Sequence, residues 1–369
     1  MVDLKNQYLR IKDEIDSAIQ RVIDSTAFIQ GPEVGEFGQK LSTYLGGTQV
    51  VTCANGTDAL QIAMMALELK SGDEVIVPVH TYVATAEVIA LLNLKPVFVD
   101  VDEQTFQIDV SQLESKITAR TKAIVPVHLY GQCADMEPIL QLAKKHGLYV
   151  IEDAAQALGA EYTFSNGSKM KAGTMGTIGT TSFFPSKNLG CFGDGGAIFT
   201  HDKVLAGKIK MIANHGQQQK YHHDNVGVNS RLDTLQAAIL NVKLNYLDEY
   251  TKRRNMVSEY YDRELGGVKE IALPLRSRNS SHVFHQYTIR VNKRNELKSY
   301  LEGQGVPTMI YYPLPLHFQK AYQQPGFGEG SFPVTERLSK TVLSLPIHTE
   351  MKEEELKFIC ESIKRFYQS

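Results

Sequence analysis

The stretch around Lys187 combines an apolar strand with a glycine-rich turn. Residues 180–184 read Thr-Thr-Ser-Phe-Phe, Pro185 ends the run, and glycines follow at positions 190, 193, 195 and 196. A lysine between a buried strand and such a turn is placed like an amine that traps carbonyl groups covalently. A solvated loop lysine is the simpler interpretation of this residue alone. The hypothesis therefore depends on finding the other parts of an imine-forming site elsewhere in the chain.

The elements that would position such a site alternate regularly. Apolar strands at 50–53, 75–77, 97–99, 123–127 and 149–151 are separated by helical patterns at 58–69, 83–92, 110–117 and 136–146. This alternation indicates a mainly parallel sheet that is covered on both faces. Ligands bind such sheets beyond the carboxyl ends of the strands, so the polar residues that follow each strand are the candidates.

The remaining elements predict a second, smaller domain. Helical patterns at 5–24 and 34–44 precede the sheet, and strands at 180–184 and 196–200 complete it. A long helix over 232–250 leads away from it, followed by a strand at 283–291, a helix at 296–304, a strand at 308–312 and a helix at 353–366. We therefore expect a large α/β domain over 1–247 and a small α+β domain over 248–369.

Composition narrows the class of protein. The 369 residues are 43% hydrophobic and 22% charged, and the net charge of −2 favours neither a nucleic-acid partner nor a membrane surface. The first 30 residues lack the apolar core of a signal peptide, and no apolar run is long enough to span a membrane. The four cysteines lie far apart, which predicts neither a metal site nor a disulfide framework. We expect a cytoplasmic protein.

Residues 55–58, Asn-Gly-Thr-Asp, lie between a strand and a helix. Gly56 would allow close backbone approach, and the free amides at the start of the helix could hold a phosphate group. A helix N-cap formed by Thr57 or Asp58 is an equally good interpretation of this turn taken alone.

Three further residues follow strands or lie in them. Asp153 ends the apolar run 149–151, where a buried carboxylate would need a cationic partner such as a protonated pyridine nitrogen. Tyr82 could stack on a planar cofactor, and Ser182 could bind the same phosphate as Gly56. Each also has an ordinary interpretation: a cap on a helix that begins at Ala154, a tyrosine packed in the core, and a serine in a strand.

The order of these residues is more informative than any one of them. Along the chain they run phosphate loop, aromatic ring, carboxylate, serine and lysine. The cofactor that needs this set is pyridoxal 5'-phosphate (PLP), whose aldehyde takes the lysine, whose ring nitrogen takes the carboxylate and whose phosphate takes the amides.

The sequence resembles the DegT/StrS-type sugar aminotransferases, which are fold-type I PLP enzymes. The resemblance spans essentially the whole chain and rests on the motifs NGTDAL (55–60), GDEVI (72–76), EDAAQA (152–157), SFFPSKN (182–188), GDGG (193–196), NHG (214–216), NSRLD (229–233) and YPLPLH (312–317). It implies a mainly parallel seven-stranded sheet in the large domain.

The resemblance also implies roles for individual residues. Lys187 would form the imine with the cofactor and, once freed, move the proton between the substrate and the cofactor. Asp153 would hold the pyridinium, Tyr82 would stack on the ring, and Gln156 would face the ring hydroxyl. The phosphate would be held by Gly56, Thr57, Ser182 and, from a neighbouring subunit, Asn229. The family's enzymes are homodimers with shared active sites, and the nucleotide-sugar groove would contain Arg231, Tyr311, Tyr312 and His317. For Arg231 a surface cation at a helix start, and for His317 a loop histidine, are the alternatives.

The resemblance is greatest to the branch that aminates C3 of dTDP-3-keto-6-deoxyhexoses, with L-glutamate as the amino donor and 2-oxoglutarate as the product. A neighbouring branch acts on UDP-linked 3-keto sugar acids and often has histidine where this chain has Tyr311. Amination at C4 is a more distant alternative. A dehydrating branch has histidine at the position of Lys187, so the lysine argues against that chemistry.

Two other functions compete with this prediction. A regulatory homologue without catalysis would not need both Lys187 and Asp153. A PLP lyase or a desulfurase is the other alternative; a desulfurase would need a reactive cysteine, and Cys191 lies close to Lys187 in sequence. However, Cys191 belongs to the glycine turn, where a packed thiol is the simpler interpretation.

Overall fold

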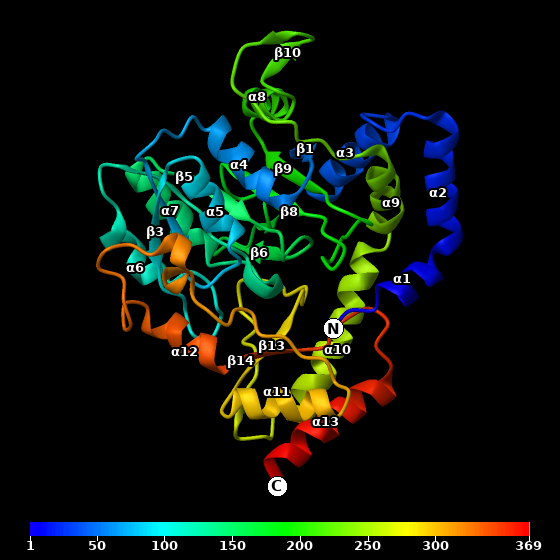
Figure 1. The fold of residues 1–369 in the computed structure, drawn as a ribbon, viewed down its shortest axis with the longest axis vertical. Coiled ribbons are helices and arrows are strands. Elements are labelled where there is room, and N and C mark those ends of the chain that lie inside the picture. The colour runs from blue at the N-terminus through cyan, green and yellow to red at the C-terminus, as the bar shows by residue number, and fades with distance from the viewer. Residues whose placement is uncertain (369) are drawn as a thin grey trace.

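The computed structural model describes residues 1–368 and shows a sheet domain with a smaller C-terminal part beneath it (Figure 1). The predicted helix over 5–24 is in fact two helices, α1 (Leu4–Arg10) and α2 (Lys12–Ser25). The break falls at Ile11, whose backbone leaves the helical region (φ −121°) as its side chain is buried. The third helix, α3 (Pro32–Tyr44), confirms the prediction over 34–44 and begins with proline at its first position.

A seven-stranded sheet forms the centre of the large domain, and its order is β1-β9-β8-β5-β4-β2-β3. Its strands are β1 (Gln49–Cys53), β2 (Glu74–Pro78), β3 (Lys95–Val99), β4 (Thr121–Ile124), β5 (Tyr149–Asp153), β8 (Ile178–Ser182) and β9 (Gly196–Thr200). The pairs among β3, β2, β4, β5 and β8 are parallel, whereas β9 runs antiparallel to both β8 and β1. The predicted fold class, a mainly parallel sheet, is therefore confirmed.

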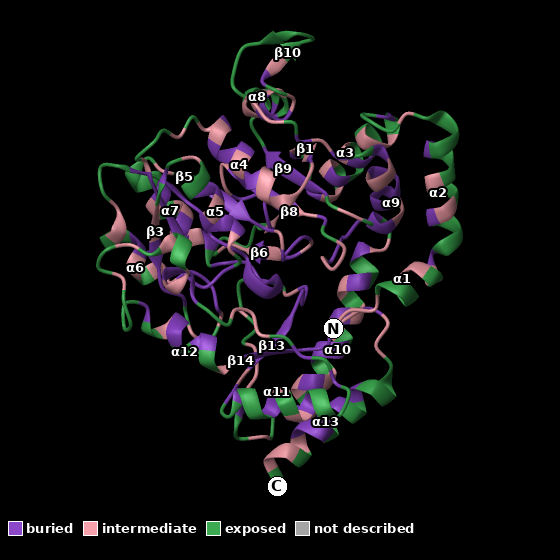
Figure 2. Ribbon diagram, in the orientation of Figure 1, coloured by how far each residue is buried: buried purple, intermediate pink, exposed green. Residues whose placement is uncertain are grey.

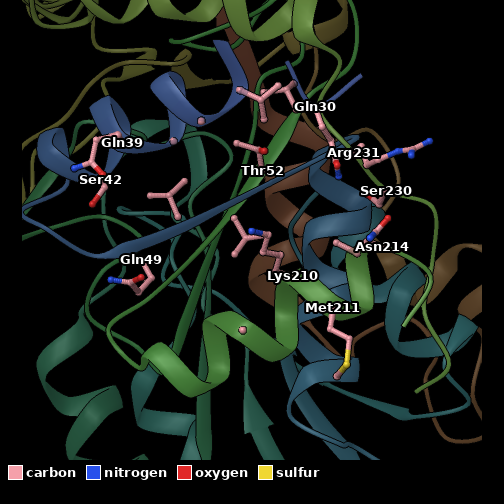
Figure 3. Close-up of a pocket in the computed structure, with 18 of the residues that line it drawn as sticks. Gln30, Gln39, Ser42, Gln49, Thr52, Lys210, Met211, Asn214, Ser230 and Arg231 are labelled. Carbon is pink, nitrogen blue, oxygen red and sulfur yellow. The ribbon is translucent and has the colours of Figure 1, made fainter. Parts of the chain in front are cut away.

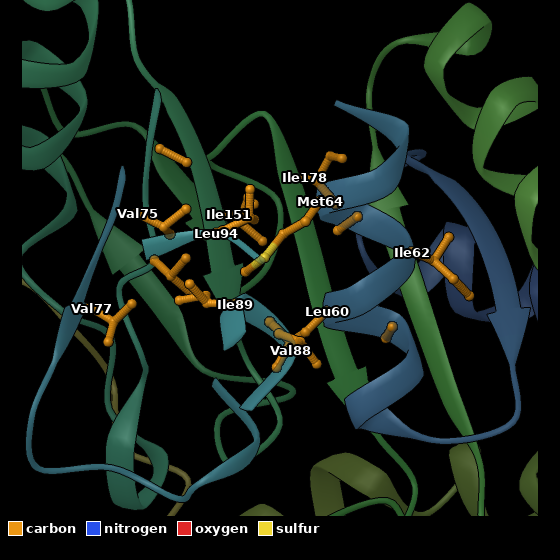
Figure 4. Packing of buried hydrophobic residues seen from close by; sticks show 14 of the residues in the cluster. Leu60, Ile62, Met64, Val75, Val77, Val88, Ile89, Leu94, Ile151 and Ile178 are labelled. Atoms are coloured by element: carbon orange, nitrogen blue, oxygen red, sulfur yellow. The ribbon is translucent and has the colours of Figure 1, made fainter. Parts of the chain in front are cut away.

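Helices cover both faces of this sheet. They are α4 (Gly56–Ala66), α5 (Ala84–Leu91), α6 (Val110–Lys116), α7 (Met136–His146) and α8 (Lys203–Ala213). Val75 and Val77 pack with α4 and α5 on one face, and Ile76 packs with α6 and α7 on the other. Figure 4 shows side chains of α4 and α5 directed at the first face, and Figure 2 shows that the central part of the sheet is mostly buried. The near-continuous apolar strands of the sequence follow from this two-sided burial.

The predicted helix over 232–250 is divided. α9 (Thr234–Leu244) packs against α2 and α3, and α10 (Leu247–Leu265) leads into the C-terminal part. At the junction the amides of Asn245 and Tyr246 bond to carbonyls three residues back, and the backbone of Tyr246 lies at φ −103° and ψ −2°. This tightening of the last turn ends α9 and redirects the chain.

The C-terminal part has an antiparallel sheet and a core of its own. It is built from β12 (Ile271–Ala272), β13 (Tyr287–Val291), β14 (Val342–Leu345), α11 (Arg294–Gly303), α12 (Pro333–Thr341) and α13 (Glu353–Gln368). The predicted strand over 308–312 is wrong, since only Met309 makes a bridge, to Ser344. Pro313 and Pro315, which cannot donate to a sheet, follow directly. The domain boundary at Leu247 stays a prediction. Two residues from beyond it, Leu316 and Phe332, pack into the core that α4 and α5 form with the large sheet.

Short elements join these layers. They are the hairpins β6 (Glu161–Thr163) with β7 (Lys169–Lys171) and β10 (Gln217–Gln219) with β11 (His222–His223), and the 3-10 turns η1 (Leu129–Gly131), η2 (Leu316–Phe318) and η3 (Lys320–Tyr322). The four cysteines are buried free thiols. Across residues 1–368, none of the helices has both the length and the apolar character needed to cross a membrane.

Candidate active site

The start of α4 and the end of β8 approach each other closely enough to require glycine. A Cβ added to Gly56 would lie 2.7 Å from Cβ of Ser182, so no other residue fits there without a shift. The cap of α4 is Asn55, whose Oδ1 accepts from the amide of Asp58 at 2.8 Å. The alternative of a cap by Thr57 or Asp58 is therefore wrong, and Asn55 is the residue that the sequence reading missed. The turn places Gly56, Thr57 and Ser182 together, as a phosphate site would require.

Asp153 lies at the carboxyl end of β5, beside β8, and is 7% exposed. Its Oδ2 accepts from the Thr85 hydroxyl at 2.9 Å, and its Oδ1 accepts from the amide of Ala155 at 3.1 Å. The predicted helix after Asp153 does not exist, because residues 155–159 form turns. The helix-cap interpretation of Asp153 is thus wrong, and a buried carboxylate remains at the sheet edge.

Lys187 is half-buried in the turn that follows β8. Its amide donates to the carbonyl of Phe184, and a Cβ on Gly190 would lie 2.4 Å from the carbonyl oxygen of Pro185, so the turn depends on glycine there. Burial lowers the pKa of the Lys187 ammonium group to about 8, and the nearby Asp153 carboxylate opposes this shift. Lys187 is therefore an amine that is partly neutral near physiological pH, which a carbonyl-trapping group needs.

This pKa predicts the pH dependence of cofactor attachment. Only the neutral amine attacks an aldehyde, so the rate at which added PLP becomes attached to the apo-protein should rise with pH and level off above about 8. Below that pH it should fall about tenfold per pH unit, since the neutral fraction of the amine falls in that proportion. Stopped-flow absorbance between pH 6 and 10 measures the rate, with Lys187→Ala as the unreactive control. A rate that still climbs tenfold per unit above pH 9 would contradict the assigned pKa.

Tyr82, Gln156 and Tyr312 form one wall of the site. Tyr82 is 57% exposed, and its ring centroid lies 6.2 Å from that of Tyr312. The exposed ring is free to stack on a planar group, so the interpretation of Tyr82 as a core residue is wrong. Gln156 Oε1 accepts from the amide of Tyr130 at 2.8 Å, and its Nε2 donates to the Tyr312 hydroxyl at 3.2 Å.

Tyr130 holds this wall in place and was not found from the sequence. It is buried with a left-handed backbone (φ 62°), and its hydroxyl donates to the carbonyl of Tyr311. His80 Nε2 lies 3.1 Å from the Tyr130 hydroxyl oxygen and donates to it, because that hydroxyl's own proton is used. Burial lowers the pKa of His80 to about 4, so this imidazole is neutral. A non-glycine residue with positive φ beside a site is a recurring feature of strained functional loops.

The residues predicted to line the sugar groove lie in three places. Tyr311 and Tyr312 are half-buried beside the site. His317 is 1% exposed, lies 3.2 Å from Glu336 Oε1 and packs on the Phe332 ring, which favours a structural role. Arg231 lines an open cavity of about 950 Å³ between α3, β1 and α8, shown in Figure 3. None of the predicted cofactor residues lines that cavity.

Asn229 is exposed and pairs with Asn214 in a single antiparallel bridge. It lies in the segment that joins the β10–β11 hairpin to α9, and the hydroxyl of the next residue, Ser230, accepts from the amide of Ala54 at 3.0 Å, just before the Gly56 turn. Its predicted contact with a phosphate in a neighbouring subunit stays a prediction.

The residues present fit PLP. A primary amine with a lowered pKa, a buried carboxylate and a turn that only glycine can form converge where the aldehyde, the ring nitrogen and the phosphate of PLP would need them. Thr85, which binds Asp153, comes from a helix 68 residues away in sequence. No local pattern marks it, since a threonine in a helix is ordinary until its partner is known.

Comparison with known proteins identifies the family. Residues 9–364 match the model of the DegT/DnrJ/EryC1/StrS aminotransferase family. The chain belongs to that family. This confirms the resemblance found in the sequence, and members of the family are PLP-dependent aminotransferases. The protein is accordingly a PLP-dependent enzyme that transfers amino groups.

Individual relatives cover nearly the whole chain. A UDP-2-acetamido-2-deoxy-3-oxo-D-glucuronate aminotransferase of Pseudomonas aeruginosa is 49% identical, over 98% of each chain. A dTDP-3-amino-3,6-dideoxy-alpha-D-galactopyranose transaminase of Aneurinibacillus thermoaerophilus is 44% identical, over 99% of this chain and 98% of the relative. The crystal structure of Streptomyces venezuelae DesV in complex with a ketimine intermediate superposes with a TM-score of 0.96 at 40% identity, over 100% of this chain and 98% of that one.

These findings bear on the competing functions. The chain belongs to a family of PLP-dependent aminotransferases and is an enzyme, so the alternative of a homologue without catalysis is not favoured. Cys191 is fully buried, its Sγ lies 3.1 Å from the carbonyl oxygens of Phe183 and Gly193, and burial raises the pKa of its thiol to about 11. It is therefore a packed thiol and not the nucleophile that a desulfurase would need.

Proposed function

We propose that the enzyme transfers the amino group of L-glutamate to C3 of a nucleotide-linked 3-keto hexose. Both relatives described above are named for sugars that carry the reacting group at C3. The observation that carries the proposal is the placement of Lys187, with its lowered pKa, between the Asp153 carboxylate and a turn suited to phosphate. The half-buried tyrosines at 311 and 312 would lie along the sugar.

The chain's own residues would act as follows. When bound, PLP supplies an electron sink that makes the substrate carbon acidic. Asp153 would keep the proton on the ring nitrogen, and Gln156, whose oxygen is already used by Tyr130, presents only amide hydrogens to an acceptor. The neutral Lys187 amine would take the proton from glutamate and later return one to the sugar carbon.

The two candidate substrates differ at C6 of the sugar. A dTDP-linked 6-deoxyhexose carries a methyl group there, which suits an aromatic wall made of the rings of Tyr82, Tyr311 and Tyr312. A UDP-linked sugar acid carries a carboxylate, which would need a cation. The 49% identity to the glucuronate aminotransferase favours this second candidate, and the 44% identity to the dTDP-sugar transaminase favours the first. We place the 6-deoxy substrate first because of the aromatic wall.

A substrate panel tests the proposal. The holoenzyme is offered glutamate with dTDP-3-keto-6-deoxyhexoses, UDP-3-keto sugar acids and a 4-keto sugar, and NMR locates the new amine. We expect an amine at C3, one 2-oxoglutarate per product, and ping-pong kinetics. An amine at C4, or a preference for the sugar acid of more than about tenfold in kcat/KM, would overturn the assignment of carbon or of sugar respectively.

We also propose a homodimer with shared active sites. The resemblance to the family assigns a further phosphate donor, the side-chain amide of Asn229, to a neighbouring subunit, beside Gly56, Thr57 and Ser182 of the first. Asn229 is exposed, and the β10–β11 hairpin that precedes it in the chain projects from the body (Figure 1), so both are available to a second subunit. Sedimentation of the wild type and of Asn229→Ala, with the PLP affinity of each, tests this. A monomer that binds PLP as tightly as the wild type does would contradict it.

A further inference from the structure

One side chain, that of Thr85, donates a hydrogen bond to the carboxylate of Asp153. The Thr85 hydroxyl donates to Asp153 Oδ2 at 2.9 Å, and both residues are buried, Thr85 completely. Within residues 1–368, the only other hydrogen-bond donor to this carboxylate is the amide of Ala155, on Oδ1. The pair therefore fixes which way the plane of the carboxylate faces, and neither donor carries a charge.

The position of Thr85 in α5 adds a second effect. Thr85 is the second residue of that helix, whose cap residue Val83 supplies no side-chain hydrogen bond. The carboxylate of Asp153 therefore lies by the first turn of α5, and the packing of that helix sets the position of the Thr85 hydroxyl.

We propose that Thr85 is a positioning residue for the pyridinium contact of this enzyme: by binding Oδ2 it keeps the Asp153 carboxylate aimed at the ring nitrogen of PLP. This role rests on cofactor binding alone, so it does not depend on which sugar is the substrate. Removing the hydroxyl should weaken binding only of a cofactor that has a ring N–H for Asp153 to hold. If the hydroxyl served only packing, its removal would weaken binding of any cofactor of the same shape.

That difference can be measured with two cofactors. PLP and 1-deazapyridoxal 5'-phosphate, in which C–H replaces the ring nitrogen, both attach to Lys187 and carry the same phosphate. In Thr85→Val, which keeps the shape of the side chain, we expect the dissociation constant for PLP to rise about tenfold and that for the deaza analogue to stay within twofold. The apo-protein is titrated by absorbance, without substrate.

Three further variants complete the design. Thr85→Ser keeps the hydroxyl and should restore the preference for PLP. Thr180→Val is the matched control, because this buried hydroxyl donates to the carbonyl of Glu152 at 3.0 Å and not to Asp153. In Asp153→Ala, adding Thr85→Val should change neither constant further, since the partner of the hydroxyl is gone.

The outcomes are distinct. If Thr85→Val lowers the affinity for both cofactors equally, the proposal is overturned in favour of a packing role. If the affinity for neither cofactor falls, the proposal is overturned as well. If the valine variant does not fold, Thr85→Ala supplies the same ratio of the two constants. Failure of the sugar panel would leave these binding constants, and therefore this test, unaffected.

Discussion

Replacing Lys187 by alanine should abolish turnover and remove the absorbance band of covalently bound cofactor. Lys187 is an amine that is partly neutral near pH 8 and lies near the Asp153 carboxylate, and it would serve both as the anchor of PLP and as the proton carrier. We expect kcat to fall by at least about 10⁴-fold, since covalent and acid-base contributions are lost together.

The matched control is Lys187→Arg, which keeps a cation in the turn but cannot form the bond. Both variants should keep the secondary structure of the wild type by circular dichroism, because the turn is held by backbone contacts of Phe184 and Gly190 and by the amine of Lys243 on the carbonyl of Gly190. Product formation is followed as 2-oxoglutarate released from glutamate. Activity of Lys187→Ala within tenfold of the wild type would refute the assigned role.

The second large effect concerns stability. Glu152 is fully buried, and its carboxylate accepts from His128 Nε2 at 2.8 Å and from the amides of Gly173, Met175 and Gly176. The Nδ1 of His128 already accepts from the amide of Ala134, so His128 is neutral and donates through Nε2. Glu152→Ala leaves four donors without a partner, three of them in buried residues and one in the half-buried Gly176.

We therefore expect Glu152→Ala to lower the free energy of unfolding by about 3–5 kcal/mol. Urea denaturation of the apo-protein measures it, and Glu114→Ala is the control, because the exposed Glu114 pairs only with surface groups and should cost less than about 1 kcal/mol. Because Asp153 follows Glu152 directly, PLP affinity should fall in the same variant. A change in unfolding free energy below about 1 kcal/mol would show that the donors find other partners.

Most strands and helices of the large domain could be predicted because their signals are local. A strand buried on both faces has to be apolar at almost every position, as residues 75–77 and 149–151 are. Breaks inside periodic segments were missed, at Ile11 and at Asn245, because the apolar pattern continues across them while the backbone tightens or turns. The antiparallel direction of β9 also follows from its pairing with β8, which the order of apolar residues in the sequence does not indicate.

The chemistry of the site was determined by the sequence. Lys187, Asp153, Gly56 and Ser182 occur in an order and with neighbours that few sites other than a PLP site would need, and the fold brings them together at the ends of β5 and β8. Their residue types suffice for this, because an amine, a carboxylate and a glycine turn would each bind one group of the cofactor.

What only the tertiary structure decided is how these groups are held. Thr85 binds Asp153 across 68 residues, Tyr130 and Gln156 bond across 26, and His317 faces Glu336, away from the site. Such partners are chosen by burial, since a polar group removed from water must find a donor or acceptor wherever the packed chain supplies one. Apolar periodicity and the order of motifs therefore do not predict these hydrogen-bond partners.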